Sequence, residues 1–133
     1  MLDGSGRLTV GGEEHAAARG TCASVPAGTR WSAQADDELV VLSVLVHDPE
    51  PAAEPSVVDI GGGDAQVATA GREFTLGAEC RSVTQFVGVI PPGRAPDHFH
   101  RYDEVVYVLR GTGTLHIGGE TAELSPGASV HLP

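Results

Sequence analysis

The chain has 133 residues, of which 41% are apolar and only 5% aromatic, and it carries a formal net charge of −10. Eight arginines and no lysine against 18 acidic residues argue against nucleic acid and an anionic membrane surface as partners, since both require a basic face. Glycine (18) and proline (9) are frequent, which favours short strands joined by tight turns.

The termini and cysteines suggest a cytoplasmic protein. The N-terminal sequence MLDGSGRLTV lacks the charged start and apolar run of a signal peptide. The longest apolar run, Leu39–Val46, is too short to span a membrane and is interrupted by Ser43. Cys22 and Cys80 lack CxxC spacing, so we expect reduced, partly buried thiols.

Strand patterns dominate the whole chain, and an antiparallel β-barrel or double-sheet jelly roll fits them best. The expected strands are, in chain order, residues 7–10, 21–25, 38–46, 80–90, 104–109, 112–117 and 129–132. The segment Glu38–Val46 is the strongest of these, because it is rich in β-branched residues. Residues 104–109 and 112–117 are expected to pair around Arg110-Gly111. Residues 48–55, rich in proline and acids, are expected to form a linker.

The chain also nearly repeats itself at a spacing of 107 residues. Leu2–Pro26 aligns without a gap on Leu109–Pro133, with Gly11-Gly12-Glu13 recurring as Gly118-Gly119-Glu120. Glycines recur at most of the identical positions, so the repeated feature is a pattern of strands and tight turns. The chain therefore holds one full period and a duplicated segment, as in a window across two tandem domains or in a permuted single domain.

One segment carries candidate chemistry. In PDHFHRYDE, His98 and His100 are two residues apart, which on a strand places both imidazoles on one face. A turn would then return Glu104 to the same side. Two imidazoles and a carboxylate suit Fe(II), Mn(II), Zn(II) or Ni(II) and leave coordination positions open. The simpler alternative is a hydrogen-bonded histidine pair at a strand end with Glu104 as a solvated partner.

This segment resembles the first cupin motif, G-x5-H-x-H-x3,4-E-x6-G, at His98, His100, Glu104 and Gly111. Gly93 stands one residue too close to His98. The sequence GGETAELSPGASVHLP resembles the start of the second cupin motif. In the earlier copy of the repeat, the position expected for that motif's metal histidine holds Trp31, which cannot bind metal.

The resemblance implies a cupin-type antiparallel barrel, or double-stranded β-helix jelly roll, in an unusual order. Residues 1–47 resemble the C-terminal half of one cupin, and residues 56–133 the N-terminal part of the next, as in a bicupin. The halves would close a permuted barrel or be completed by strand exchange. Because the duplicated segments compete for one position in a barrel, we expect a homodimer.

The resemblance further implies a divalent transition metal (Fe, Mn, Zn or Ni) and a small organic substrate or ligand. Cupin enzymes include dioxygenases, decarboxylases, isomerases and cyclases, and a dioxygenase-like oxidoreductase is the first expectation. Glu104 would both bind the metal and move a proton. The alternatives are a non-catalytic, storage-type binding module and an inactive fragment of a bicupin.

Several other residues are candidates around this site. Trp31, Gln85 and Tyr102 are expected to line a substrate pocket, with Arg101 beside the ligands. His131, Gln85 or water are the alternatives for a fourth ligand. His15 is expected at the surface.

Overall fold

The structure is a computed structural model that describes residues 1–47, 54–62, 66–67, 72–80 and 83–133. These residues form two compact units, Met1–Ala95 (unit 1) and Pro96–Pro133 (unit 2), which are considered separately. Within the described residues all regular structure is β-strand except one turn of 3-10 helix, η1 (Ile60–Gly62), which confirms the all-β prediction. No helix among them has the length and apolar character needed to cross a membrane.

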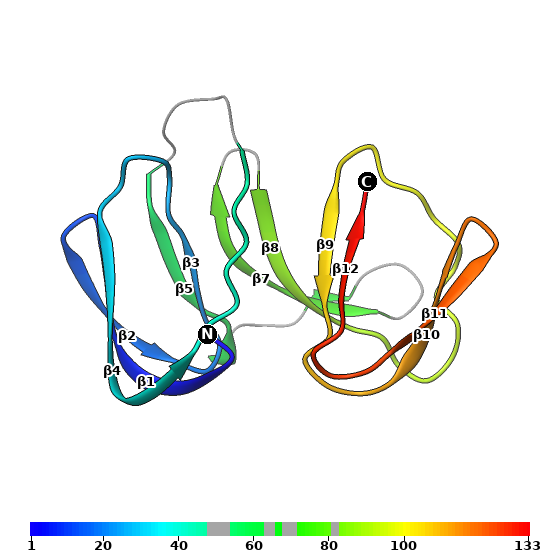
Figure 1. Cartoon of the computed structure of the whole chain (residues 1–133), viewed down its shortest axis with the longest axis horizontal. Coiled ribbons are helices and arrows are strands. Elements are labelled where there is room, and N and C mark those ends of the chain that lie inside the picture. Colours follow the sequence, from blue (N-terminus) through cyan, green and yellow to red (C-terminus); the bar gives the residue numbers. More distant parts are fainter. Residues whose placement is uncertain (48–53, 63–65, 68–71, 81–82) are drawn as a thin grey trace. The chain divides into compact units, whose positions relative to one another are not determined.

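The described residues of unit 1 form eight strands in three sheets (Figure 1). Its first sheet has the order β2-β1-β4, and β3 pairs with β5, while the third sheet has the order β6-β7-β8. All described pairings are antiparallel. The strands are β1 (Asp3–Val10), β2 (Glu13–Ala18), β3 (Thr21–Ser24), β4 (Trp31–Val40), β5 (Ser56–Asp59), β6 (Gln66–Val67), β7 (Glu73–Cys80) and β8 (Val83–Val89).

The core of unit 1 lies on one face of the β1–β2 hairpin. Leu8, Val10 and Ala17 are each only 2% exposed, with Met1, Ala23 and Val57 packed against them. Alternation explains this set, because every second residue of β1 points to the same side. The opposite face carries Arg7 and Thr9.

Unit 2 contains four strands in two antiparallel pairs. These strands are β9 (Glu104–Tyr107), β10 (Gly113–Ile117), β11 (Glu120–Leu124) and β12 (Ser129–Leu132). β9 pairs with β12, and β10 pairs with β11. The expected pairing of 104–109 with 112–117 is therefore wrong. The reason is the turn at Gly118-Gly119. The positive φ angles of these residues, 55° and 92°, form a tight hairpin turn directly after β10, so β10 pairs with the strand that follows it, β11.

The two copies of the repeat fold alike. Gly11-Gly12, with φ of 61° and 94°, joins β1 to β2 as Gly118-Gly119 joins β10 to β11. The hairpin registers also correspond, since Val10 pairs with Glu13 and Ile117 with Glu120. Cys22 on β3 pairs with Val58 on β5, and its equivalent Ser129 on β12 pairs with Tyr107 on β9.

The strand expected at Glu38–Val46 is misplaced. β4 is Trp31–Val40, and residues 41–47 have no regular structure. The ladder with β1 runs from Trp31 opposite Val10 to Val40 opposite Asp3, so β1 has no residues left to pair beyond Val40. High β-propensity does not form a strand without a hydrogen-bonding partner. As a result Val41, Leu42, Val44, Leu45 and Val46 are all exposed, Leu45 by 89%.

The long strand expected at residues 80–90 is divided. Cys80 ends β7, which we did not predict, and β8 begins at Val83. Residues 81–82 lie outside the described part, as do 48–53, most of the expected linker. The strand expected at 129–132 is confirmed with the same bounds, that at 21–25 ends one residue earlier, and that at 7–10 begins four residues earlier.

Candidate metal centre

Glu104 begins β9, whereas His98 and His100 precede that strand. Residues 94–103 form an irregular segment leading into β9. The expectation that a strand aligns the two histidines is therefore wrong, and the local chain path brings them together instead. Their imidazole centroids lie 5.0 Å apart with the rings tilted by 56°.

The Nδ1 atom of each imidazole lies beside a hydrogen-bond acceptor. Nδ1 of His98 lies 2.9 Å from the carbonyl oxygen of Pro96. Because a carbonyl oxygen only accepts, His98 donates from Nδ1 and keeps its lone pair on Nε2. Nδ1 of His100 lies 3.1 Å from Oε2 of Glu104, and both of these side chains are largely buried, at 23% and 20% exposure. Donation to this carboxylate likewise leaves Nε2 of His100 free to bind a ligand.

Tyr102 stacks on His100. The ring centroids are 4.7 Å apart, and the rings are almost parallel, at 8°. The Tyr102 side chain is otherwise exposed, so this contact with His100 fixes one of its faces. The two neighbours of His100, a carboxylate at Nδ1 and an aromatic ring on its face, together restrict the imidazole's rotation.

His131 is turned away from this group. In the β9–β12 ladder Leu132 is opposite Glu104 and His131 is opposite Val105. Directly opposite residues share a face of a ribbon, so Glu104 and His131 lie on opposite faces. Consistent with this, Nε2 of His131 approaches Oδ2 of Asp103 at 3.6 Å, and both side chains are exposed. This arrangement argues against His131 as a fourth ligand beside Glu104.

The side-chain types of His98, His100 and Glu104 fit a transition metal, although Glu104 does not complete a three-ligand set with the two histidines. Two imidazoles that bind one ion have centroids at most about 6.5 Å apart, since each nitrogen lies about 2.1 Å from the metal. The spacing of His98 and His100 is within this limit. Glu104, however, is engaged by His100, and no set of three histidine, cysteine or acidic side chains in the described residues has metal-site geometry. The geometry thus supplies two nitrogen donors and a carboxylate that holds one of them.

Trp31 and Gln85 both belong to unit 1. Trp31 begins β4 and is 58% exposed. The amide oxygen of Gln85, on β8, lies beside Gly77 of β7, where an added Cβ would approach it to 3.2 Å. Their predicted role in lining a substrate pocket with Tyr102 remains a prediction.

The environment of Cys22 disfavours its thiolate. Burial raises its pKa, and Asp59 raises it further, while the N-terminal ammonium and a hydrogen bond with the Ala78 backbone act in the opposite direction. Since the thiolate is the reactive form, a raised pKa lowers reactivity at neutral pH. This agrees with the sequence repeat, in which Ser129 occupies the equivalent position.

Sequence reasoning missed two features of these units. The Pro96 carbonyl that orients His98 carries no motif signal, because any residue supplies a backbone carbonyl. His15, expected at the surface, is instead half-buried and lines a pocket with Glu13 in unit 1. The signal that could have placed His15 is the hairpin register, in which it lies opposite the core residue Leu8.

Comparisons with known proteins support the cupin superfamily. Residues 86–133 match the family model described as Cupin domain. Over 97 residues the chain is 31% identical to the quercetin 2,3-dioxygenase of Bacillus subtilis (strain 168), and the match covers 69% of this chain but 28% of the relative. The fold is similar to the crystal structure of a Pseudomonas aeruginosa protein described as glyoxylate-induced. That match has a TM-score of 0.75 at 20% identity and covers 98% of this chain and 54% of the other.

Proposed function

We propose that this chain, which has the all-β fold of the cupin superfamily, binds a divalent transition metal at His98, His100 and Glu104 and acts on a small organic molecule. The observation that carries the proposal is that the Nδ1 atom of each imidazole lies beside an acceptor of its own. Both Nδ1 atoms face hydrogen-bond acceptors, the Pro96 carbonyl and the Glu104 carboxylate, so both Nε2 lone pairs remain for a metal.

The ligand set determines what the bound ion would supply. When bound, a divalent metal acts as a Lewis acid that lowers the pKa of substrate oxygens and leaves open positions for water or O2. His98 and His100 would hold it through Nε2. Mn, Fe, Ni and Zn all accept imidazole and carboxylate donors, so we propose no single metal.

Glu104 has a double assignment. Its Oε2 accepts from His100 Nδ1, which fixes the orientation of that ring. Its other oxygen, Oε1, is available for the metal or for a proton from the substrate, so we assign Glu104 as the proton-transferring group. The dioxygenase relative supports an oxidoreductase of this type, although the chain spans only 28% of its length.

The domain organisation extends this proposal. We infer that residues 1–47 and 56–133 are halves of successive cupins joined by residues 48–55. The equivalent ladders β3–β5 and β12–β9 support this, because β5 occupies beside β3 the place that β9 occupies beside β12. A permuted barrel, strand exchange within a cytoplasmic homodimer, and a bicupin remain the alternatives that this equivalence suggests.

A non-catalytic binding module is the second candidate. It is favoured by the engagement of Glu104 with His100, which leaves two nitrogen donors rather than three converging groups. Such a site would bind a metal or ligand weakly without turnover.

Metal titration of purified chains tests the assignment. Co(II) is added to the wild type and to His98→Ala, His100→Ala and His131→Ala, while the d–d absorption bands and the bound metal by elemental analysis are followed. We expect the first two variants to lose at least tenfold in affinity, since each removes one ligand. His131→Ala is the matched control, because His131 lies on the other face of β9–β12. Equal affinity in all four proteins would refute the site.

Oxygen uptake separates the two functions. The metal-loaded chain is supplied with flavonols, small phenols and oxo-acids in an oxygen electrode. Glu104→Gln keeps an oxygen donor for the metal but removes the carboxylate, so loss of turnover in metal-loaded Glu104→Gln supports the enzyme and the proton-transferring role of Glu104. Bound metal without turnover of any compound supports the binding module.

A further inference from the structure

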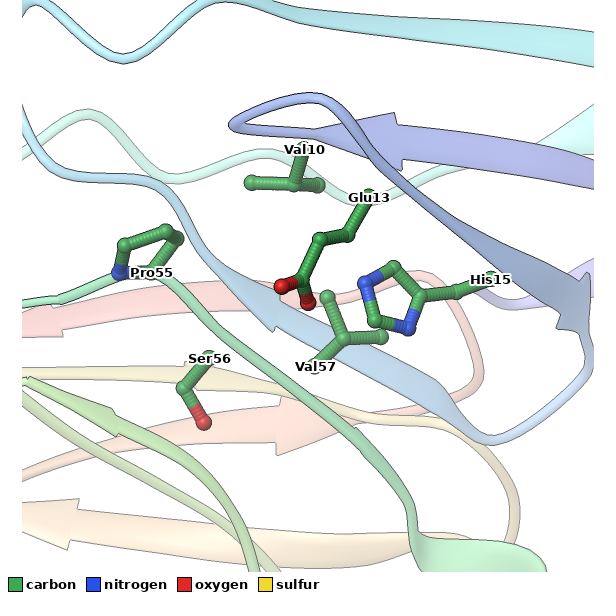
Figure 2. A pocket seen from close by; sticks show the side chains of 6 residues that line it. All are labelled: Val10, Glu13, His15, Pro55, Ser56 and Val57. Carbon is green, nitrogen blue, oxygen red and sulfur yellow. The ribbon is translucent and has the colours of Figure 1, made fainter.

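Unit 1 contains a pocket that the cupin motif does not involve. It has a volume of about 300 Å³. Its lining is Val10, Glu13, His15, Pro55, Ser56 and Val57. Figure 2 shows the Glu13 carboxylate and the His15 imidazole beside each other, with Val57 next to them and Val10, Pro55 and Ser56 around them. The pocket therefore combines an apolar wall with three kinds of polar group.

The strand register places these polar groups on the face of the sheet that carries the core. Glu13 is opposite Val10 and His15 is opposite Leu8, and both apolar partners are 2% exposed. Directly opposite residues share a face, so Glu13 and His15 point to the core side of the hairpin. Glu14, between them, points to solvent. Glu13, at the start of β2, is exposed and His15 is half-buried, so both polar groups can be reached from water at the edge of the apolar face.

The repeat shows that the hairpin does not need this pair. In unit 2 the position of Glu13 holds Glu120, but that of His15 holds Ala122, on a hairpin with the same register. A hairpin of this type thus folds with a methyl group where unit 1 has an imidazole. The His15 side chain is an addition to the fold rather than a requirement of it.

The chemistry of the lining selects the ligand. No arginine lines the pocket, and its one formally charged group at neutral pH is the Glu13 carboxylate, within a chain of net charge −10. Anions are therefore disfavoured. Only two of the lining side chains, Glu13 and His15, are metal ligands by type, one fewer than the usual minimum of three, which argues against a metal ion. A volume near 300 Å³ equals about ten water molecules, at about 30 Å³ each, and is the lower limit for organic ligands.

We propose that this pocket binds a small organic ammonium ion, with its charged end at Glu13 and its apolar part against Val10, Val57 and Pro55. A primary ammonium group has three donors, and Glu13, neutral His15 and the Ser56 hydroxyl are three acceptors. This site is independent of the proposed metal centre, because all its residues belong to unit 1.

Calorimetric titration with benzylammonium tests the proposal. Benzyl alcohol is the neutral probe of the same shape, and Glu13→Gln removes the charge with little change of volume. Because Glu13 is exposed to water, we expect affinity for benzylammonium to fall about two- to fivefold in Glu13→Gln. Benzyl alcohol lacks the charge, so its affinity for the wild type should be no higher than the affinity of benzylammonium for Glu13→Gln.

Two charge-matched controls exclude a general effect of net charge. Glu14→Gln changes the neighbour on the solvent face, and Glu120→Gln changes the repeat equivalent in unit 2; both should leave affinity unchanged. His15→Ala should weaken binding without unfolding the chain, since Ala122 occupies this position in unit 2. In NMR spectra the ligand should shift the methyl signals of Val10 and Val57. Absence of binding at millimolar benzylammonium, or an equal loss in Glu14→Gln and Glu13→Gln, would overturn the proposal.

Discussion

Substitution of Gly6 by alanine should severely destabilise unit 1. Gly6 lies in the middle of β1, opposite Ala35 of β4. A Cβ at this position would lie 2.1 Å from the backbone oxygen of Gln34 and 2.9 Å from the Cα of Ala35. Both are backbone atoms, so relief requires the two strands to separate by about 1 Å, which breaks ladder hydrogen bonds.

The magnitude follows from this clash. Overpacking in a well-packed region costs about 1–3 kcal/mol, and loss of ladder hydrogen bonds adds about 1 kcal/mol for each bond. We therefore expect Gly6→Ala to lower the free energy of unfolding by about 3 kcal/mol, a large part of the 5–15 kcal/mol of an ordinary domain. With a urea m-value of about 2 kcal/mol/M, the midpoint should fall by about 1.5 M.

The sole tryptophan makes the assay local. Trp31 is on β4, opposite Val10 of β1, so its fluorescence reports separation of these two strands during urea unfolding. The matched control is Gly113→Ala, the repeat equivalent on β10, where an added Cβ meets nothing within 4 Å. Alanine there should be neutral or stabilise by about 0.5 kcal/mol, because glycine inside a strand is entropically costly. Equal midpoints for Gly6→Ala and Gly113→Ala would refute the close approach of β1 and β4.

Three further predictions concern two side chains, Cys22 and Tyr102. The Cys22 thiol should react with iodoacetamide more slowly than glutathione at pH 8 and at an equal rate in 8 M urea, because burial raises its pKa; fast labelling of the folded chain would contradict this. The raised pKa also makes stability depend on pH. Its stabilising contribution is complete below the pKa of the thiol in the unfolded chain and is lost as pH rises through the higher pKa of the folded chain. Unfolding free energies of wild type and Cys22→Ser, measured between pH 7 and 10, should reveal this loss. Tyr102→Ala should weaken Co(II) binding about threefold by removing the stacked ring from His100, whereas Tyr102→Phe should not; identical affinities in the two variants would exclude a positioning role.

The sequence predicted the turns better than the strand pairings. Gly11-Gly12 and Gly118-Gly119 have positive φ values that few other residues adopt, so these glycine pairs mark the turns, although β2 and β11, the strands that follow them, were not predicted. The all-β fold class followed from the same glycine-rich turns between short strand patterns. The extent of β4 could not be predicted, since residues 41–46 have the composition of a strand and only the ladder with β1 decides where pairing ends.

The candidate site was likewise predicted only in part. His98, His100 and Glu104 were identified by type and spacing, but the irregular path of residues 94–103 and the bond from His100 to Glu104 depend on tertiary context. The face of His131 also required the β9–β12 register, because an offset of one residue would place it beside Glu104.

The apolar run that follows β4 has a practical consequence for handling the protein. Residues 41–46, five of them apolar, enter no ladder and include no proline, lysine or arginine. They resemble the segments that nucleate intermolecular β-sheet at high concentration. Mutual repulsion between acidic molecules opposes such contacts, and it weakens as salt is added or as pH approaches the isoelectric point near 4.8. Dilute, low-salt buffers well above that pH are thus the conditions in which colloidal stability should be greatest.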